Sequence, residues 1–144
     1  MNTTLGANVE QLAVYGGAIA GTGNSLNNSL YGASATAGVT FDGAAGDDTL
    51  QGSNFNDTLT GGSGADTFAF TSAFGNDIVL DFQATGLAHD LLQFDVGAFA
   101  TATAALAAAA QVGADVVIAA SASDSVTLKS INLASLSASD FRIG

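Results

Sequence analysis

An aspartate recurs every nine residues near the middle of the chain, at Asp48, Asp57 and Asp66. Each one follows a glycine-containing stretch and precedes an apolar residue by two positions, so the unit is typical of a turn followed by a very short strand. Glycine tolerates positive φ without steric cost, which lets backbone carbonyls crowd inward at such a turn. Carbonyls and carboxylates from neighbouring turns can supply the roughly six to eight oxygens that calcium prefers. The spacing therefore predicts a calcium site.

The three nine-residue units are not equivalent. The unit at residues 61–69 is complete, the unit at residues 43–51 is nearly so, and the unit between them has Phe55 where its fourth-position glycine belongs. Two units complete one coil, so turns eighteen residues apart stack on the same side, and calcium is expected between residues 43–48 and 61–66. A degraded or differently built site is expected at residues 52–57. The candidate metal ligands in these turns are Gly43, Ala45, Asp48, Asp57, Gly61, Gly62, Ser63, Gly64 and Asp66.

Apolar residues at the eighth position of each unit indicate how the coils pack. Phe41, Leu50, Leu59 and Phe68 lie nine apart, so each would point from a short strand into the interior of a flattened coil. The predicted fold is mainly all-β, a parallel β-roll (β-helix) of stacked nonapeptide coils. Residues 8–40 are expected to form degenerate coils without metal, since Asn28 replaces the aspartate there.

Residues 61–68, 74–82 and 89–94 together resemble the RTX (repeats-in-toxin) proteins of Gram-negative bacteria, specifically their C-terminal calcium-binding and secretion modules. The first segment is similar to the family nonapeptide, the second to its closing motif and the third to the strand that follows. The resemblance implies that Asp81 and Asp90 are further calcium ligands, with Asp77 a weaker candidate. It also implies a secreted, extracellular protein whose active portion is an attached upstream passenger domain.

The remaining chain is expected to cap the roll within a single domain spanning residues 1–144, in which residues 41–70 carry the calcium repeats. Within the capping region, residues 71–144, the alanine-rich residues 101–111 predict one helix. Residues 116–119 and 125–128 predict a terminal β-hairpin. The resemblance implies that the C-terminal region, which ends in residues 133–144, carries an uncleaved signal read by the type I secretion machinery.

The charge of the chain limits its partners. Thirteen acidic residues against two basic ones give a formal net charge of −11, which argues against nucleic acid and against an anionic membrane. No run reaches transmembrane length, so no membrane insertion is expected. The chain has no cysteine, which excludes a disulfide framework. Because concentrated aspartates repel one another without a counterion, folding of the repeats is expected to depend on Ca²⁺.

Three other interpretations stand beside the calcium-folding module. The glycine-rich repeats could be a flexible linker, but a linker gives no reason for the apolar nine-residue register. The chain could instead be an adhesion module that binds a polysaccharide or a surface, although the absence of tryptophan provides poorly for stacking on sugars. A free-standing hydrolase ranks last, because His89 has no accompanying nucleophile motif. We therefore expect a non-catalytic module. Asp95, Asp115 and Asp124 are interpreted as turn residues.

Overall fold

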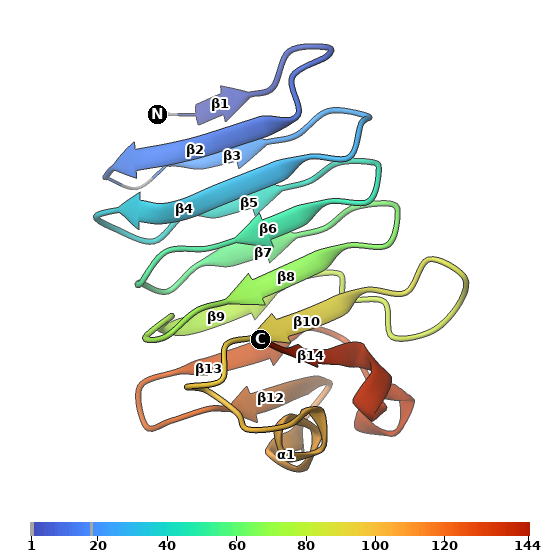
Figure 1. Cartoon of the computed structure of the whole chain (residues 1–144). Helices are drawn as coiled ribbons and strands as arrows, with labels where there is room; N and C mark the ends of the chain where they lie inside the picture. The colour runs from blue at the N-terminus through green and yellow to red at the C-terminus, as the bar shows by residue number, and fades with distance from the viewer. Residues whose placement is uncertain (1, 18) are drawn as a thin grey trace.

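The computed structural model describes residues 2–17 and 19–144, and it is a parallel β-solenoid in which the chain alternates between two sheets (Figure 1). Odd-numbered strands of the coils lie in one sheet and even-numbered strands in the other. The first sheet contains β1 (Asn2–Thr4), β3 (Ala20–Thr22), β5 (Thr40–Asp42), β7 (Thr58–Thr60) and β9 (Asn76–Val79). The second contains β2 (Gln11–Gly16), β4 (Ser29–Ala35), β6 (Thr49–Gln51), β8 (Thr67–Phe70) and β10 (Leu91–Phe94). The predicted β-roll is confirmed.

The eighth-position residues form the core, as the nine-residue register predicted. Phe41 lies in register with Leu59 in one sheet, and Leu50 with Phe68 in the other. All four side chains are fully buried between the sheets. Each pair is separated by two units, so one coil takes two turns and two strands. Short strands suffice here because each of the repeat strands β5, β6, β7 and β8 pairs on both sides, with the coil above and the coil below.

The coil that leads into the repeats accommodates two additional residues, whereas the coil before it keeps the eighteen-residue spacing. Leu30 lies in register with Leu50, and Gly21 lies in register with Phe41. At Gly21 an added Cβ would lie 2.6 Å from the Leu12 side chain and 3.0 Å from the Phe41 ring. Glycine at this inward position therefore leaves room for the larger side chains of neighbouring coils, and the early strands stack as predicted.

The C-terminal cap extends both sheets. The predicted hairpin is confirmed as β12 (Asp115–Ala119) paired antiparallel with β13 (Ser125–Leu128), and β13 pairs in parallel with β9. The last strand, β14 (Phe141–Ile143), pairs in parallel with β10 and buries Phe141. Two 3-10 turns, η1 (Leu133–Ser135) and η2 (Ala138–Asp140), precede it. The parallel edge of each sheet is therefore covered at this end.

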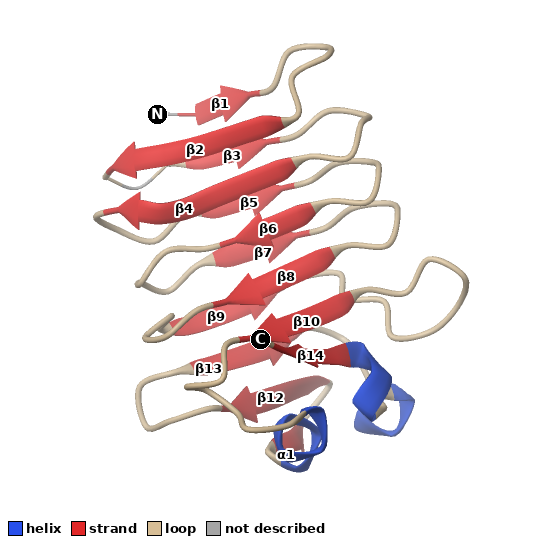
Figure 2. Ribbon diagram, in the orientation of Figure 1, coloured by secondary structure: helices blue, strands red, loops and turns tan. Residues whose placement is uncertain are grey.

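The helix predicted over residues 101–111 is wrong in its extent. Helix α1 covers only Ala102–Ala107 (Figure 2). The chain then enters β11 (Ala109–Val112). Thr101 begins the helix by accepting a hydrogen bond from the amide of Ala104 at 3.1 Å. Pairing with β12 overrides the helix propensity of the later alanines, because it satisfies the backbone groups of a strand at the sheet edge. Among the described residues, no helix is long and apolar enough to cross a bilayer.

Candidate calcium sites

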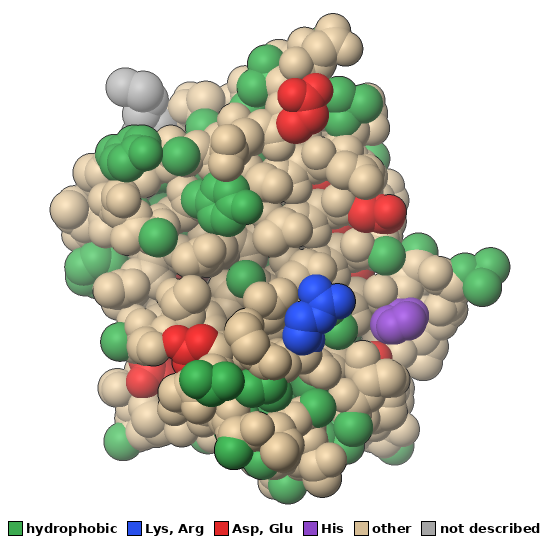
Figure 3. Space-filling view, viewed as in Figure 1, with side chains coloured by type: hydrophobic (Ala, Val, Ile, Leu, Met, Phe, Trp, Pro, Cys, Tyr) green, Lys and Arg blue, Asp and Glu red, His purple; other side chains and the backbone are tan. Residues whose placement is uncertain are grey.

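The turns of the solenoid form two edges, which lie on the right and left in Figure 1. We call residues 23–28, 43–48, 61–66 and 80–90 the first edge, and residues 36–39, 52–57 and 71–75 the second edge. Figure 3 shows that the acidic side chains visible in this view gather toward the edges rather than on the broad face of the sheet. The edges are therefore the places where a cation would be attracted.

The two turns predicted to enclose calcium stack directly on one another. The amide of Gly46 donates to the carbonyl of Ser63 at 2.9 Å, and the amide of Ser63 donates to the carbonyl of Ala44 at 3.1 Å. An isolated parallel bridge joins Ala45 to Ser63. The turns at residues 43–48 and 61–66 are thus held face to face by their backbones, as the eighteen-residue spacing predicted.

Both turns place their second and fourth residues at positive φ. The values are 77° at Ala44, 110° at Gly46, 97° at Gly62 and 138° at Gly64. A Cβ at Gly62 or Gly64 would collide with the backbone carbonyl of the turn stacked above. Glycine is therefore required at both positions by close approach as well as by conformation, and the lower turn satisfies both demands.

A ladder of hydrogen bonds runs down the first edge through the sixth-position side chains. The amide of Asn28 donates to Oδ1 of Asp48 at 2.7 Å, and the amide of Asp48 donates to Oδ1 of Asp66 at 2.9 Å. The amide of Asp66 in turn donates to Oδ1 of Asp90 at 2.9 Å. One oxygen of each carboxylate therefore accepts a hydrogen bond from the backbone of the preceding coil.

The second oxygen of two of these aspartates is buried without a partner. Oδ2 of Asp48 and Oδ2 of Asp66 make no hydrogen bond, and each residue is only 1% exposed. A Cβ on Gly43 would collide with Oδ2 of Asp48 and the carbonyl oxygen of Gly61, so these two oxygens converge on the space beside that glycine. An uncompensated buried carboxylate is costly, and a divalent cation removes that cost. The residues present fit calcium.

The pKa values of Asp48 and Asp66 reflect the same cost of burying a charged carboxylate. Burial raises the pKa of Asp48 to about 6, and the nearby charge of Asp66 contributes in the same direction. Burial likewise raises the pKa of Asp66, assisted by the charges of Asp81 and Asp47. Hydrogen bonds from the ladder amides oppose both shifts without cancelling them. The carboxylate form of this edge is therefore the form that needs a counterion.

No group of three His, Cys, Asp or Glu side chains converges to hold a metal within residues 2–17 and 19–144. A calcium ion in these turns would consequently take much of its coordination from backbone carbonyls, which are ordinary calcium ligands. The carbonyl of Ser63 already accepts one hydrogen bond, from Gly46, and retains a second lone pair. The predicted carbonyl ligands at Gly43, Ala45, Gly61, Gly62, Ser63 and Gly64 all lie within the two stacked turns.

Asp81 and Asp90 close the lower end of the first edge. Asp81 accepts the amide of Gly61 at 2.9 Å on Oδ1 and the amide of Gly62 at 2.8 Å on Oδ2. Asp90 accepts the amide of Asp66 on Oδ1 and that of Gln83 at 2.8 Å on Oδ2. Burial raises the pKa of Asp90 to about 6. Both carboxylates thus accept amides of the last repeat turn, and the role of calcium ligand that the resemblance implied for them stays a prediction.

The second edge has its own, shorter ladder. The amide of Val39 donates to Oδ1 of Asp57 at 2.7 Å, and the amide of Asp57 donates to Oδ1 of Asp77 at 2.9 Å. Oδ2 of Asp77 is buried without a partner, and burial raises the pKa of Asp77 to about 8. Asp57 differs, because Ser53 donates to both of its oxygens. The irregular turn expected at residues 52–57 is therefore built differently from the others.

Asp77 occupies the sixth position of its turn in the structure, although the sequence analysis named it only a weaker candidate for a calcium ligand. The turn before it has positive φ at Ala73 (57°) and Gly75 (87°), the same pattern as the first-edge turns. Eleven residues separate Asp66 from Asp77, so the nine-residue frame misses it. Two features of the sequence could have identified Asp77 as a sixth-position residue. They are Gly75, two positions before it, and the buried Val79, two positions after it.

A second ladder at the fifth position was not anticipated. The amide of Asp47 donates to Oδ1 of Asn27, and the amide of Ala65 donates to Oδ1 of Asp47, both at 2.9 Å. On the second edge the amide of Asn76 donates to Oδ1 of Asn56 at 2.9 Å. The recurrence of Asn or Asp immediately before the sixth position was the available signal. These side chains hold successive turns in register.

The carboxylates interpreted as turn residues lie outside the two stacked turns at residues 43–48 and 61–66. Oδ1 of Asp115 accepts the amide of Ser130 at 2.9 Å, and its Oδ2 lies 2.5 Å from Nζ of Lys129. These contacts, led by the lysine hydrogen bond, lower the pKa of Asp115.

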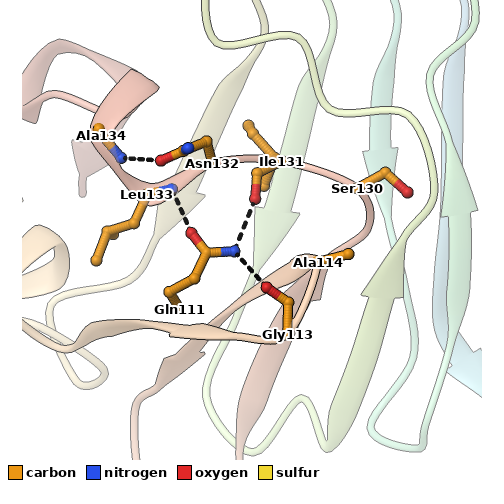
Figure 4. A pocket seen from close by; sticks show the side chains of 8 residues that line it. All are labelled: Gln111, Gly113, Ala114, Ser130, Ile131, Asn132, Leu133 and Ala134. Carbon is orange, nitrogen blue, oxygen red and sulfur yellow. Dashed lines mark hydrogen bonds between the residues drawn. The ribbon is translucent and has the colours of Figure 1, made fainter.

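Nearby, a shallow pocket is bridged by Gln111, whose amide donates to the carbonyls of Gly113 and Ile131 and accepts from the amide of Leu133 (Figure 4). Its polar groups are used to tie the cap together.

A two-sheet coil whose stacked glycine turns present buried, unpartnered carboxylates defines a calcium-binding β-roll. Residues 42–79 match the RTX calcium-binding nonapeptide repeat in four copies, so this part of the chain consists of RTX repeats that bind calcium. The extracellular lipase LipA from Serratia marcescens is structurally similar over 87% of this chain, with 26% sequence identity and a TM-score of 0.54. The chain corresponds to 21% of that lipase. No curated protein matches the chain significantly.

Proposed function

We propose that this chain is a calcium-dependent folding module that acts outside the cell and carries a C-terminal signal for type I secretion. The observation that carries the proposal is the pair of buried, unpartnered oxygens on Asp48 and Asp66 in stacked turns. Without calcium these carboxylates are uncompensated and disfavour the coil. Calcium that binds only the folded turns shifts the equilibrium toward the roll.

The energy available from calcium is sufficient for such a switch. For an extracellular module with a dissociation constant of roughly 10⁻⁴ M, about 1 mM calcium adds about 1.4 kcal/mol per site. Two or three sites together would decide the state of a marginally stable domain. Where calcium is scarce, the acidic repeats would remain unfolded, which suits passage through an export channel.

Circular dichroism in calcium-free buffer and then in millimolar calcium tests the folding step. We expect a gain of β-structure on adding calcium and little effect of magnesium, because magnesium demands a smaller octahedral shell and dehydrates reluctantly. An identical β-signal with and without calcium would exclude coupled folding. A magnesium response equal to that of calcium would exclude the carbonyl-rich site.

We further propose, as the family resemblance implies, that the C-terminal region ending in residues 133–144 contains the export signal and that the chain works attached to an upstream passenger domain. The similarity to one fifth of an extracellular lipase supports this arrangement. Removal of residues 140–144 should reduce secretion through a type I exporter. Calcium titration of the purified truncated chain separates a lost signal from a lost fold, and normal export would remove this segment from the signal.

We propose that the module itself is not catalytic and that it belongs to a secreted protein of a Gram-negative bacterium. Apart from the exposed Glu10, the described carboxylates are engaged in amide ladders, turn contacts and the candidate calcium turns, which supports a structural role for them. A lipase assay on this chain alone is expected to show no hydrolysis. Activity that survives in a chain with intact calcium binding would contradict the proposal.

A further inference from the structure

The turn at residues 52–57 differs in backbone conformation from the turns around it. The turns at residues 43–48, 61–66 and 71–75 each have two residues at positive φ, whereas no residue of 52–57 has positive φ. Its second and fourth positions are occupied by Ser53 and Phe55 instead of residues in the left-handed region. The repeat therefore continues through this turn in sequence register but not in turn geometry.

Ser53 occupies the interior of this turn. Its hydroxyl donates to Oδ1 of Asp57 at 2.8 Å, and its amide lies 2.5 Å from Oδ2 of the same residue. The serine hydroxyl also accepts a hydrogen bond from the amide of Phe55 at 3.1 Å. Ser53 is 3% exposed and Asp57 is 2% exposed, so these contacts are shielded from water.

The consequence for Asp57 is opposite to that for Asp48 and Asp66 on the first edge. With the amide of Val39 added, Asp57 accepts three hydrogen bonds and leaves neither oxygen unpartnered. Asp48 and Asp66 each leave Oδ2 buried and unpartnered. A cation at Asp57 would have to displace donors that already satisfy the carboxylate, which removes most of the gain from binding.

We propose that the hydroxyl and amide of Ser53 take the place of a calcium ion in the turn at residues 52–57, which therefore closes without metal. Asp57 is then a structural hydrogen-bond acceptor rather than a calcium ligand, which revises the expectation from the sequence. The inference rests on the proposed first-edge sites for its comparison. It makes the two edges of the roll unequal, with one calcium-filled pair of turns opposite a turn closed by serine.

Counting bound calcium tests the proposal directly. Isothermal titration calorimetry should give the same number of ions for Asp57→Asn as for the unmodified chain, and fewer for Asp66→Asn. A lost ion in Asp57→Asn would overturn the proposal. If that variant does not fold in calcium, Ser53→Ala decides: the ion number should stay constant while the melting temperature in saturating calcium falls, and a lost ion would make the serine oxygen a ligand.

A gain-of-site variant provides the complementary test. The double substitution Ser53→Gly with Phe55→Gly restores glycine at the second and fourth positions and leaves Asp57 in place. We expect one calcium more per chain than in the unmodified protein, with Leu87→Gly in an exposed loop as the control for added glycine. An unchanged ion number in the folded double variant would overturn the proposal. An unmodified chain that binds no calcium would instead refute the first-edge sites.

Discussion

The amide of Asp48 donates to Oδ1 of Asp66 at 2.9 Å, across eighteen residues of sequence, while Oδ2 of each carboxylate remains buried and unpartnered. The two oxygens of Asp66 therefore have different roles in this roll. Its first oxygen fixes the register between coils, and its second is left for a cation. The separation of the two roles within one side chain means that they can be altered independently.

Replacement of Asp66 by Asn tests the metal-binding role, since it keeps an oxygen for the ladder and removes the charge. We expect the calcium midpoint of folding to rise about tenfold or more, because one charged ligand is lost. Circular dichroism against calcium concentration measures the midpoint. Asp115→Asn is the matched control, because it removes one negative charge beside Lys129 and away from the first edge. Equal midpoints for the two variants would contradict the assignment of Asp66.

The stability of the calcium-free roll should depend on pH in an unusual direction. The pKa values of Asp48 and Asp90 are raised by burial to about 6 and that of Asp77 to about 8, from an ordinary value of 3.8. The folded state thus holds protons that the unfolded state releases, and the stability they confer is present below pH 4 and lost as the pH rises through 6 and 8. Melting temperatures in calcium-free buffer should fall over this range.

Calcium affinity should follow the opposite trend over the same range. Calcium binds the deprotonated carboxylates, so its binding releases protons and strengthens as the pH rises from about 4 toward 8. Calorimetry in buffers of different ionisation enthalpy measures the released protons. A calcium-free roll that becomes more stable between pH 5 and 8 would show that these carboxylates are already compensated.

Gly64 is the position where an added methyl group should do most damage. Its φ is 138°, and a Cβ there would collide with the carbonyl oxygen of Gly46. Gly64→Ala is expected to destabilise the calcium-loaded roll by about 2 kcal/mol or more, since strained φ alone costs roughly 1–2 kcal/mol. Thermal unfolding gives the value. Gly17→Ala, where nothing lies within 4 Å of the new Cβ, should change it little.

The cap should contribute stability independently of calcium. Phe141 on β14 is 5% exposed and covers the edge of the second sheet beside β10. Phe141→Ala should lower the unfolding free energy by about 3 kcal/mol in saturating calcium, through lost burial and a cavity. Chemical denaturation measures the loss, with the exposed Arg142→Ala as control. A variant as stable as the control would mean that the last strand is dispensable.

The nine-residue register predicted the fold because each repeat places its apolar residue on a short strand that pairs in the same register. The stacking of Phe41 on Leu59 and of Leu50 on Phe68 follows from that period alone. The register failed wherever the chain inserted residues, as before Asp77, or where long-range pairing competed with local propensity. Residues 109–112 are the clearest example, because their alanines favour a helix and only the edge of β12 makes them a strand.

The sequence predicted which turns contain the candidate site. It did not predict which carboxylate oxygens accept hydrogen bonds and which remain unpartnered. The sixth-position period identified Asp48, Asp57 and Asp66 as candidate ligands, and Phe55 predicted a degraded or differently built site at Asp57. The two hydrogen bonds from Ser53 distinguish Asp57 from its neighbours, and they depend on a turn conformation that a glycine count does not specify. Likewise, both oxygens of Asp81 and of Asp90 accept backbone amides, an arrangement that depends on how the loop of residues 80–90 folds back onto the last turn and that the spacing of the aspartates does not specify.

The sixth-position ladder on the first edge has a polarity, because each of its acceptors belongs to the coil that follows the donor, whereas the acceptors of the fifth-position ladder belong to the preceding coil. The amide of Asn28 donates to Asp48, that of Asp48 to Asp66, and that of Asp66 to Asp90, and Asp90 also accepts an amide of its own loop, from Gln83. We therefore expect ordered growth from the C-terminal cap toward the N-terminus. Removal of residues 80–144 should abolish calcium-induced β-structure, while removal of residues 2–22 should preserve it. The reverse outcome would assign the seed of the solenoid to its other end.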